Sequence, residues 1–201
     1  NLELSDVDEE ELFAYCLNKG VNFISTPYSV AAVKQLDALG VSEFKVASAD
    51  IVDIPLLEAI ADTGKPVILS LGMASIGEIE TALSKFAHYE SENIVLLHCV
   101  SNYPCSDESL NLNVIDTLRN TFKLPVGFSD HSFGPLAAAI SVSMGASVVE
   151  KHFTLDKTMN GPDHKASLNP EELREMIVAI RNIERAMGDG IKKPSKSEQP
   201  N

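Results

Sequence analysis

The stretch PVILSLGMASIGEIETAL, residues 66–83, holds the pattern that decides the fold. Its first part, residues 66–72, is rich in Val, Ile and Leu and too short for a helix, which is typical of a buried β-strand. Ser75 and Glu78 then form the S-x-x-E capping box that opens a helix, predicted over residues 75–87. The stretch therefore predicts one βα unit, the building block of parallel sheets.

The same alternation of strand and helix repeats along the chain on both sides of this unit. Apolar runs of strand length lie at residues 22–28, 44–49, 66–72, 93–99, 125–131 and 147–153. Helical patterns lie at residues 5–19, 30–39, 54–62, 75–87, 111–122, 134–144 and 170–187. The strand runs are almost continuously apolar, as expected of strands that are covered on both faces.

The number of units indicates which α/β architecture to expect. Six units do not close an eight-stranded barrel, and no GxGxxG motif of a dinucleotide-binding sheet follows a strand. We therefore expect a (β/α)8 TIM-type barrel over residues 1–191 that lacks about two N-terminal units. The tail KKPSKSEQPN, residues 192–201, is polar and contains proline, so we expect it to begin a linker to a domain absent from this chain.

Composition and charge argue against several kinds of partner. The net charge of −13 disfavours nucleic acid, whose phosphates need clustered Lys and Arg, and also anionic membrane surfaces. No apolar run reaches about 18 residues, so no membrane span is predicted. Cys16, Cys99 and Cys105 have no CxxC spacing, which predicts reduced thiols in the cytoplasm, with Cys16 and Cys99 in the core.

Serine recurs where the predicted strands end. The carboxyl ends of barrel strands meet on one face, where hydroxyls and backbone amides can hold a phosphate or a carboxylate. Lys45, inside an apolar strand, is expected to supply the counter-charge, whereas alternation directs Lys151 toward the helices. Ordinary turn serines are the alternative. The serines concerned are Ser25 (beside Thr26), Ser48, Ser70, Ser101 and Ser129.

Two histidines lie on adjacent predicted strands. Alternation places Ser129 and His131 on one face of their strand, and Glu150 and His152 on one face of the next. Two imidazoles at this edge could hold one exchangeable Mn²⁺ or Mg²⁺, and the alternative is two separately hydrogen-bonded histidines. His98 also has two interpretations, a packed core histidine or an inward-facing site residue.

The loop NGPDHKAS, residues 160–167, follows the last predicted strand. Long loops on the carboxyl face of a barrel usually bind substrate, and this loop clusters Asp163, His164 and Lys165. A solvated, charged loop without a ligand is the alternative interpretation.

Seven motifs along the chain match one family in order. They are STPYS, FKVASAD, VILSLGM, HCVSNYP, GFSDHS, EKHFT and GPDHKASLNPEEL. Through them almost the whole chain resembles the sialic acid synthase (N-acetylneuraminate synthase) family, including its N,N'-diacetyllegionaminate synthase branch. The resemblance implies a metal-dependent, C–C bond-forming transferase. Such an enzyme condenses phosphoenolpyruvate with an N-acetylated amino sugar, N-acetylmannosamine, to give a nine-carbon sialic acid and phosphate.

The resemblance also implies an assembly and a set of ligands. The family is a homodimer whose barrel precedes a small antifreeze-like domain, so the first two barrel strands and that domain would be absent here. His131 and His152 would bind the divalent metal, Mn²⁺ or Mg²⁺. Lys45 would bind phosphoenolpyruvate and offset its charge during catalysis. The hydroxyls that would bind phosphoenolpyruvate with it belong to Thr26, Ser48, Ser70, Ser101 and Ser129.

The remaining implied roles concern the sugar and the proton. Tyr103 and Asp163 would face the amino sugar, and Asp50 or Glu150 would handle a proton. Asp50 stands where the family more often has Glu, which affects the reach of this carboxylate. Ser101 stands where some members have Asn.

Two alternatives to this function stay open. The same condensation on a diacetylated 6-deoxy sugar would make the chain a legionaminate synthase or, with a weaker match, a pseudaminate synthase. A barrel fragment that only binds or assembles would be inactive. Lys45, both histidines and the series of serines favour a catalytic lineage.

Overall fold

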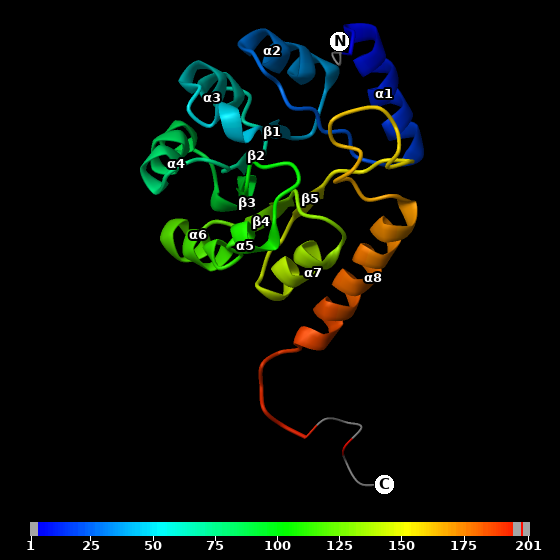
Figure 1. Ribbon diagram of the computed structural model, residues 1–201. Coiled ribbons are helices and arrows are strands. Elements are labelled where there is room, and N and C mark those ends of the chain that lie inside the picture. Colours follow the sequence, from blue (N-terminus) through cyan, green and yellow to red (C-terminus); the bar gives the residue numbers. More distant parts are fainter. Residues whose placement is uncertain (1–3, 195–197, 199–201) are drawn as a thin grey trace.

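The computed structural model describes residues 4–194 and 198 and is built on a parallel β-sheet (Figure 1). Five strands follow one another across the sheet in chain order, and each pairs in parallel with the next. They are β1 (Phe44–Val46), β2 (Val67–Ser70), β3 (Ile94–Cys99), β4 (Val126–Asp130) and β5 (Val149–Lys151). Because neighbouring strands are parallel, each connection crosses back over the sheet, as in a βα unit.

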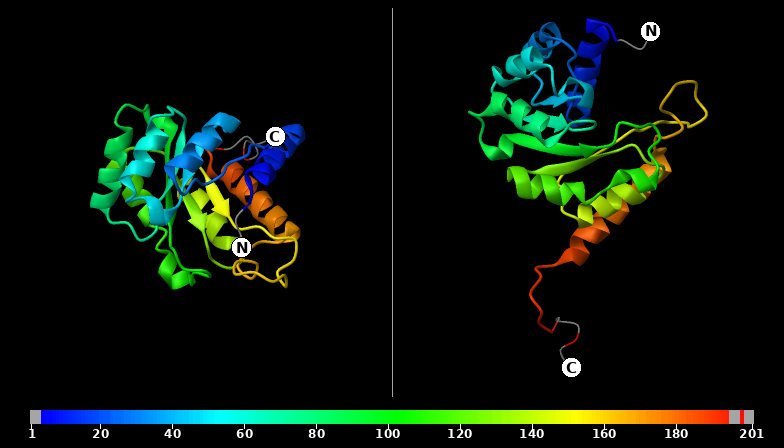
Figure 2. Two further views of the ribbon diagram at one scale, coloured as in Figure 1. Left: turned by 90° about the horizontal axis from the view of Figure 1, so that it is seen from above. Right: turned by 60° about the vertical axis from the view of Figure 1, so that its left-hand side comes forward.

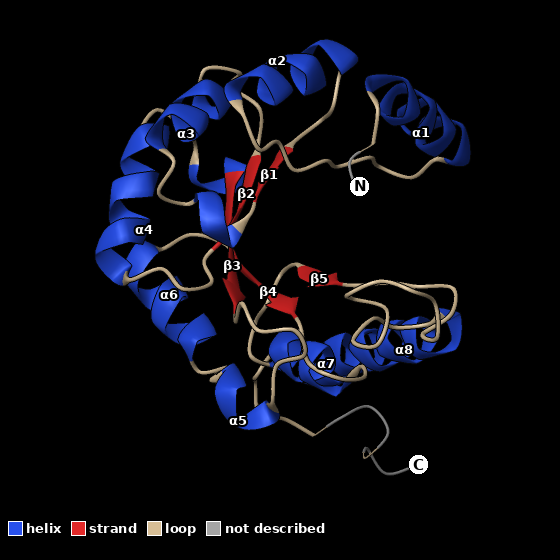
Figure 3. Ribbon diagram, turned by 45° about the horizontal axis from the view of Figure 1, so that its top comes forward, coloured by secondary structure: helices blue, strands red, loops and turns tan. Residues whose placement is uncertain are grey.

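Helices form an arc on the outer side of this curved sheet, with α1 and α8 at the two ends of the arc (Figure 3). After α8, the chain runs away from the body of the molecule (Figure 2). The arrangement is a curled parallel α/β sheet, consistent with part of a TIM-type barrel. The helices are α1 (Asp6–Lys19), α2 (Val30–Leu39), α3 (Ile54–Ala61), α4 (Ile76–Leu83), α5 (Asp107–Leu110), α6 (Val114–Phe122), α7 (Leu136–Ser143) and α8 (Pro170–Met187).

The strand predicted at residues 22–28 is wrong. Residues 21–27 belong to no helix or strand, and in the described part of the chain β1 pairs with β2 alone. A strand needs a neighbour for its ladder hydrogen bonds, and this segment has none there. Its Phe23 instead packs edge-to-face on Phe13 of α1, with ring centroids 5.8 Å apart. Ile24 and Tyr28 are exposed, so the segment has neither the pairing nor the burial that its apolar residues predicted.

Local signals set most helix boundaries. The predicted capping box of Ser75 and Glu78 is present at the start of α4. Asn169 caps α8, as the NPEE sequence predicts. The helix predicted at residues 111–122 is observed as α6, and the short helix α5 before it, which ends at Asn111 in a left-handed conformation (φ 43°), was not predicted.

Helix α1 packs less closely than expected of a helix whose apolar stripe consists of Leu12, Phe13, Cys16 and Leu17. None of its residues is buried, and Leu12 and Leu17 are exposed. Cys16 was expected in the core but is only half-buried, whereas Cys99 is buried as predicted. The stripe of α1 therefore finds too few neighbours among the described residues to form a full core face.

The main core fills the space between the sheet and the helices. Phe44 and Val46 of β1, Leu96 of β3 and Phe128 of β4 are all fully buried there. Because side chains alternate along a strand, Lys45 points to the opposite, concave face of the sheet. The apolar residues of the outer face thus hold the helices, whereas Lys45 lies on the face toward the cavity.

The C-terminal end bears on two further predictions. The linker expected at residues 192–201 lies partly outside the described residues, namely at 195–197 and 199–201. Residues 188–194 belong to no helix or strand. Across the part of the chain that the structure describes, no helix has both the length and the apolar character that a membrane crossing requires.

Candidate active site

A cavity of about 490 Å³ opens at the carboxyl ends of the strands. Every strand supplies a side chain to its lining: Lys45 from β1, Ser70 from β2, Cys99 from β3, Ser129 from β4 and Glu150 from β5. All the predicted site residues except Asp50 and Asp163 line it. The other lining residues are Thr26, Tyr28, Ala47, Ser48, Ala49, Met73, Ser101, Tyr103, His131, Lys151 and His152.

An ion pair between Lys45 and Glu150 spans this cavity. Lys45 Nζ lies 3.3 Å from Glu150 Oε2 and also donates to the carbonyl of Val46. Ser129 Oγ donates to the other carboxylate oxygen, Oε1, at 2.7 Å. Lys45 is only 8% exposed, so its charge is largely removed from water. The predicted cation of the site is thus present, and it already has a carboxylate partner.

Three predicted serines gather beside this pair. Ser48 Oγ accepts the backbone N–H of Gly72 at 3.0 Å. A Cβ on Gly72 would clash with Ser101 Oγ and lie 2.9 Å from Ser48 Oγ, so the glycine lets both hydroxyls approach its backbone. Ser70 Oγ is buried and has no hydrogen-bond partner among the described residues. Ser25 is the exception to the series, because its hydroxyl donates to Glu9 of α1.

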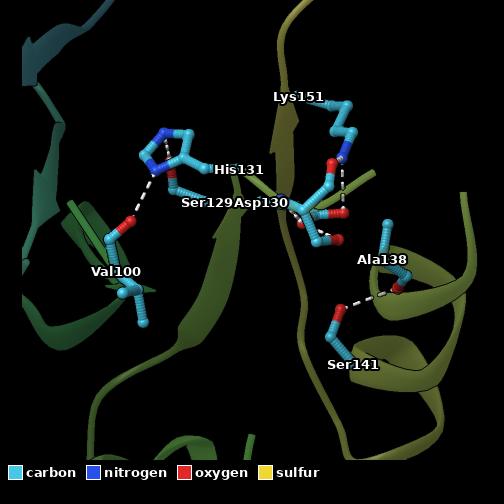
Figure 4. Close-up of polar contacts among 8 residues, drawn as sticks. Val100, Ser129, Asp130, His131, Ala138, Ser141 and Lys151 are labelled. Carbon is cyan, nitrogen blue, oxygen red and sulfur yellow. Dashed lines mark hydrogen bonds and ion pairs between the residues drawn. The ribbon is translucent and has the colours of Figure 1, made fainter. Parts of the chain in front are cut away.

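The two predicted metal ligands lie side by side at the end of β4 and β5. The ring centroids of His131 and His152 are 5.4 Å apart. His131 Nδ1 lies 2.8 Å from the carbonyl of Val100, so this nitrogen carries the proton and donates (Figure 4). The lone pair of His131 is therefore on Nε2, which lies 3.5 Å from Ser129 Oγ.

Burial sets the ionisation of the groups around the histidines. Burial lowers the pKa of His152, and the neighbouring His131 lowers it further, against the opposing effects of Asp163 and Glu150. The neutral imidazole that results is the form that binds metals. Tyr103 packs on the His131 ring, with centroids 3.9 Å apart, and burial is the main cause that raises the pKa of Tyr103 to about 12. Its phenol therefore keeps its proton at neutral pH.

A buried ion pair lies on the other face of the same two strands. Asp130 and Lys151 are paired in register, and Lys151 Nζ is 2.9 Å from Asp130 Oδ2, with side chains 0% and 3% exposed. Asp130 Oδ1 accepts both the N–H and the hydroxyl of Ser132. Figure 4 shows His131 and Ser129 on one side of β4 and Asp130 with Lys151 on the other. The ammonium of Lys151 is thus directed to the opposite side of β4 from Ser129 and His131, as strand alternation predicts, although Lys151 also lines the cavity.

Sequence comparison now identifies the relatives of this chain, since residues 1–192 match the NeuB family. The chain belongs to the NeuB family. An uncharacterised protein of Methanocaldococcus jannaschii is 50% identical over 199 residues, which cover 99% of this chain and 59% of that protein. An N,N'-diacetyllegionaminic acid synthase of Campylobacter jejuni is 47% identical over 202 residues, covering 100% of this chain and 60% of that enzyme.

A solved structure of a NeuB-type protein has the same fold. The N-acetylneuraminic acid synthetase of Leptospira borgpetersenii, crystallised with citrate, superposes with a TM-score of 0.92 at 40% identity. The match covers 98% of this chain and 69% of that one. The chain spans about 60% of the length of the curated NeuB relatives described above.

Asp50 and Asp163 are the predicted NeuB-type site residues outside the cavity lining. Asp50 lies in the 3₁₀ turn Ser48–Asp50 after β1, and burial, with the charge of Asp53, raises its pKa. Its Oδ2 is buried and has no hydrogen-bond partner in the described chain. Burial raises the pKa of Tyr103 and lowers that of His152, and the charge of Asp163 contributes an upward shift to both. The roles assigned to both aspartates stay predictions.

Several lining residues were not predicted from the sequence, among them Cys99, Tyr28 and Met73. Cys99 Sγ lies 3.8 Å from His131 Nδ1, Tyr28 is exposed at the cavity, and Met73 has a left-handed backbone (φ 66°). Apolar and sulfur-containing side chains at strand ends are indistinguishable from core residues in the sequence. Their signal in the sequence was their position two or three residues from a predicted serine.

The two-histidine site fits a weakly held divalent cation. Within the described ranges, no group of three or more His, Cys, Asp and Glu side chains is arranged to hold a metal ion. The donors would therefore be the imidazoles of His131 and His152, with water and substrate completing the coordination. The fixed tautomer of His131 and the lowered pKa of His152 both suit this role.

The structure decides between the two interpretations of His98. Its Nε2 lies 2.7 Å from the carbonyl of Leu110, and its ring stacks on Phe128 with centroids 5.8 Å apart. Burial lowers the pKa of His98. It is a packed core histidine outside the cavity. His164 of the predicted substrate loop is held by Thr154, whose hydroxyl lies 2.7 Å from His164 Nδ1.

Proposed function

We propose that this protein condenses phosphoenolpyruvate with an N-acetylated amino sugar, releasing phosphate and forming a nine-carbon sialic acid. The observation that carries the proposal is the convergence of Lys45, Ser70 and Ser129 with the His131–His152 pair in one cavity. An anion site beside a cation site is what this reaction needs. Membership of the NeuB family supports the same chemistry.

The anionic substrate would lie against Lys45. Its ammonium is buried and can offset the charge of a phosphate or carboxylate more strongly than an exposed lysine can. The hydroxyls that would complete the anion site belong to Thr26, Ser48, Ser70, Ser101 and Ser129. These groups hold the phosphoenolpyruvate with its methylene carbon toward the sugar.

The sugar would bind on the histidine side of the cavity. His131 and His152 would hold a divalent cation, Mn²⁺ or Mg²⁺, which when bound supplies a Lewis acid for the aldehyde of the open-chain sugar. Tyr103 covers the two imidazoles, and its protonated phenol can donate a hydrogen bond to a sugar oxygen. Asp163 acts at the mouth of the same space.

The reaction would proceed by attack of the methylene carbon of phosphoenolpyruvate on the aldehyde carbon. Water then adds to the carbon that carries the phosphate, and phosphate leaves with cleavage of the C–O bond. Glu150, whose side chain lines the cavity, would accept a proton. Asp50 would play this part only if its turn brought the carboxylate into the cavity.

N-Acetylmannosamine is the first candidate for the sugar. A diacetylated 6-deoxy sugar is the second, favoured by the 47% identity to a relative named N,N'-diacetyllegionaminic acid synthase. The first candidate is supported by the 40% identity to the structure named N-acetylneuraminic acid synthetase. We further propose that the protein works as a homodimer in the cytoplasm, in its natural full length.

The test is phosphate release from phosphoenolpyruvate in the presence of Mn²⁺, with each sugar offered separately and the product identified by mass spectrometry. The expected result is release that depends on the sugar and on the metal. His131→Ala should abolish most of it, with His88→Ala, an exposed histidine, as the matched control. Absence of sugar-dependent release with either sugar, or full turnover of the His131 variant, would overturn the proposal.

A further inference from the structure

We infer that Glu150 is an internal competitor of the anionic substrate: its carboxylate occupies two donors of the anion site, and the substrate must displace it to bind. The inference rests on the proposed function, because it takes phosphoenolpyruvate as the anion. It adds a role for Glu150 in setting how tightly the cavity holds an anion, separate from any proton transfer.

The contacts of Glu150 are those of a bound anion. Its Oε2 lies 3.3 Å from Lys45 Nζ, and its Oε1 accepts the Ser129 hydroxyl at 2.7 Å. Each carboxylate oxygen thus has its own charged or hydroxyl partner, as a ligand carboxylate or phosphate would have. Both partners are buried, at 8% exposure for Lys45 and 2% for Ser129. The Glu150 carboxylate therefore makes the contacts with Lys45 and Ser129 that the anionic group of the substrate would make.

A third donor in the same lining has no partner. Ser70 Oγ belongs to a side chain only 2% exposed, and none of the described residues hydrogen-bonds to it. Buried hydroxyls are almost always paired, so an unpaired one in a cavity points to a ligand group. Glu150 satisfies Lys45 and Ser129 but does not reach Ser70. An incoming anion can bond to all three, which Glu150 cannot do.

The charges in the lining make displacement necessary. Lys151 also lines the cavity, but its ammonium is paired with Asp130 on the other face of the strands. Among the described lining residues, Lys45 is therefore the ammonium available to an anion, and Glu150 neutralises it. An anion that bound without moving Glu150 would lie beside a carboxylate at close range, where like charges repel.

The two partners differ in their freedom to move. The Glu150 side chain is 42% exposed, whereas that of Lys45 is 10% exposed. Glu150 also lies on β5, which has three residues and pairs only with β4 in the described sheet. The glutamate can therefore turn toward solvent while the lysine stays in place to receive the substrate.

The experiment compares phosphoenolpyruvate binding to the wild-type protein and to Glu150→Gln, each in its natural full length, by isothermal titration calorimetry. EDTA is present, so that any change in metal binding does not contribute. Glutamine keeps the size of the side chain and removes its charge. We expect the variant to bind phosphoenolpyruvate at least about fivefold more tightly, and inorganic phosphate more tightly as well. Equal or weaker binding by the variant, or no binding to either protein, overturns the inference.

Two further variants make the result specific. Glu58→Gln removes the same charge from a Lys–Glu pair on the outside of the molecule, where Lys85 Nζ lies 3.0 Å from Glu58 Oε1, and should leave the affinity unchanged. In a Lys45→Gln background, Glu150→Gln should no longer improve phosphoenolpyruvate binding, because the ammonium for which the carboxylate and the substrate compete is absent. Circular dichroism checks that each variant is folded. An improvement that persists without Lys45 contradicts direct competition.

The outcome is separable from that of the proposed function. Wild-type protein that binds phosphoenolpyruvate but forms no product with either sugar would overturn the proposed function and leave the competition intact. Sugar-dependent phosphate release together with unchanged affinity in Glu150→Gln would overturn only the competition.

Discussion

Lys45 on β1 and Glu150 on β5 meet in an ion pair, with Nζ and Oε2 3.3 Å apart, although β1 and β5 are the outermost strands of the described sheet. Four strand spacings in a flat sheet would put these residues about 19 Å apart. The sheet must therefore curl until its two edges face each other across the cavity. This one contact demonstrates both the barrel-like curvature and the enclosure of the site.

Breaking the buried pair of Asp130 and Lys151 should strongly destabilise the protein. Lys151→Met leaves the Asp130 carboxylate buried without its counter-charge, at an expected cost of about 3–5 kcal/mol in the free energy of unfolding. The measurement is urea unfolding followed by circular dichroism. Lys85→Met breaks an exposed pair with Glu58 and should cost about 0–1 kcal/mol. Similar losses in the free energy of unfolding for the two variants would show that the buried pair stabilises the protein no more than the exposed pair does.

Gly72→Ala should damage both stability and anion binding. The added methyl group would press on the hydroxyls of Ser48 and Ser101, so we expect a loss of about 1–3 kcal/mol in the free energy of unfolding. The dissociation constant of phosphoenolpyruvate should rise in parallel. Gly77→Ala is the matched control, because nothing lies within 4 Å of its new Cβ in helix α4, and it should stabilise by about 0.5–1 kcal/mol. Unchanged binding in Gly72→Ala would contradict the proposed arrangement of hydroxyls.

Ser70→Ala should separate binding from stability. Removing a buried hydroxyl without a partner should leave the free energy of unfolding unchanged or slightly raised. Loss of a hydrogen bond to a charged ligand should weaken phosphoenolpyruvate binding by about tenfold or more. Thermal unfolding and calorimetric titration measure the two effects. Ser143→Ala, whose exposed hydroxyl bonds only within helix α7, should change neither. A destabilised Ser70 variant with normal affinity would assign this hydroxyl to the fold alone.

His98 should make stability depend on pH in the acid range. Burial lowers the pKa of His98 below the value of about 6.5 that it has in the unfolded chain. The stabilisation from the neutral ring is therefore complete above about pH 6.5 and is lost as the pH falls toward the lower pKa of the folded state. The measurement is the free energy of unfolding against pH for the wild type and for His98→Gln.

The difference between these two curves isolates His98. The pKa of His152 is also lowered by burial, but His152 is present in both proteins and cancels. We expect the wild-type curve to fall more steeply below pH 6.5 than that of the variant. Parallel curves would contradict the effect of burial on His98.

The pattern of the sequence was sufficient for the parts of the fold that depend on local chemistry. Ser75 and Asn169 mark the starts of α4 and α8, because their side chains accept hydrogen bonds from the adjacent backbone. Strand alternation correctly separated His131 and Ser129 from Asp130, since it follows from the geometry of the strand itself.

Features that depend on distant neighbours could not be predicted in this way. Residues 22–28 carry Phe, Ile and Tyr as a strand would, but they have no pairing partner in the described sheet. The role of His98 depends on the carbonyl of Leu110, and the short helix α5, which ends at the left-handed Asn111, was not predicted. The contact between Lys45 and Glu150 required the curvature of the whole sheet.

Neighbouring residues of β1 meet different requirements, because successive side chains point to opposite faces of the strand. Phe44 and Val46 pack in the core against the helices, whereas Lys45 between them lines the cavity. A change of Lys45 therefore leaves the packing of Phe44 and Val46 against the helices untouched. In such a scaffold, a cavity residue such as Lys45 can change while the core stays the same. The relatives at 47% and 40% identity, which are named for two different acids, are consistent with this separation.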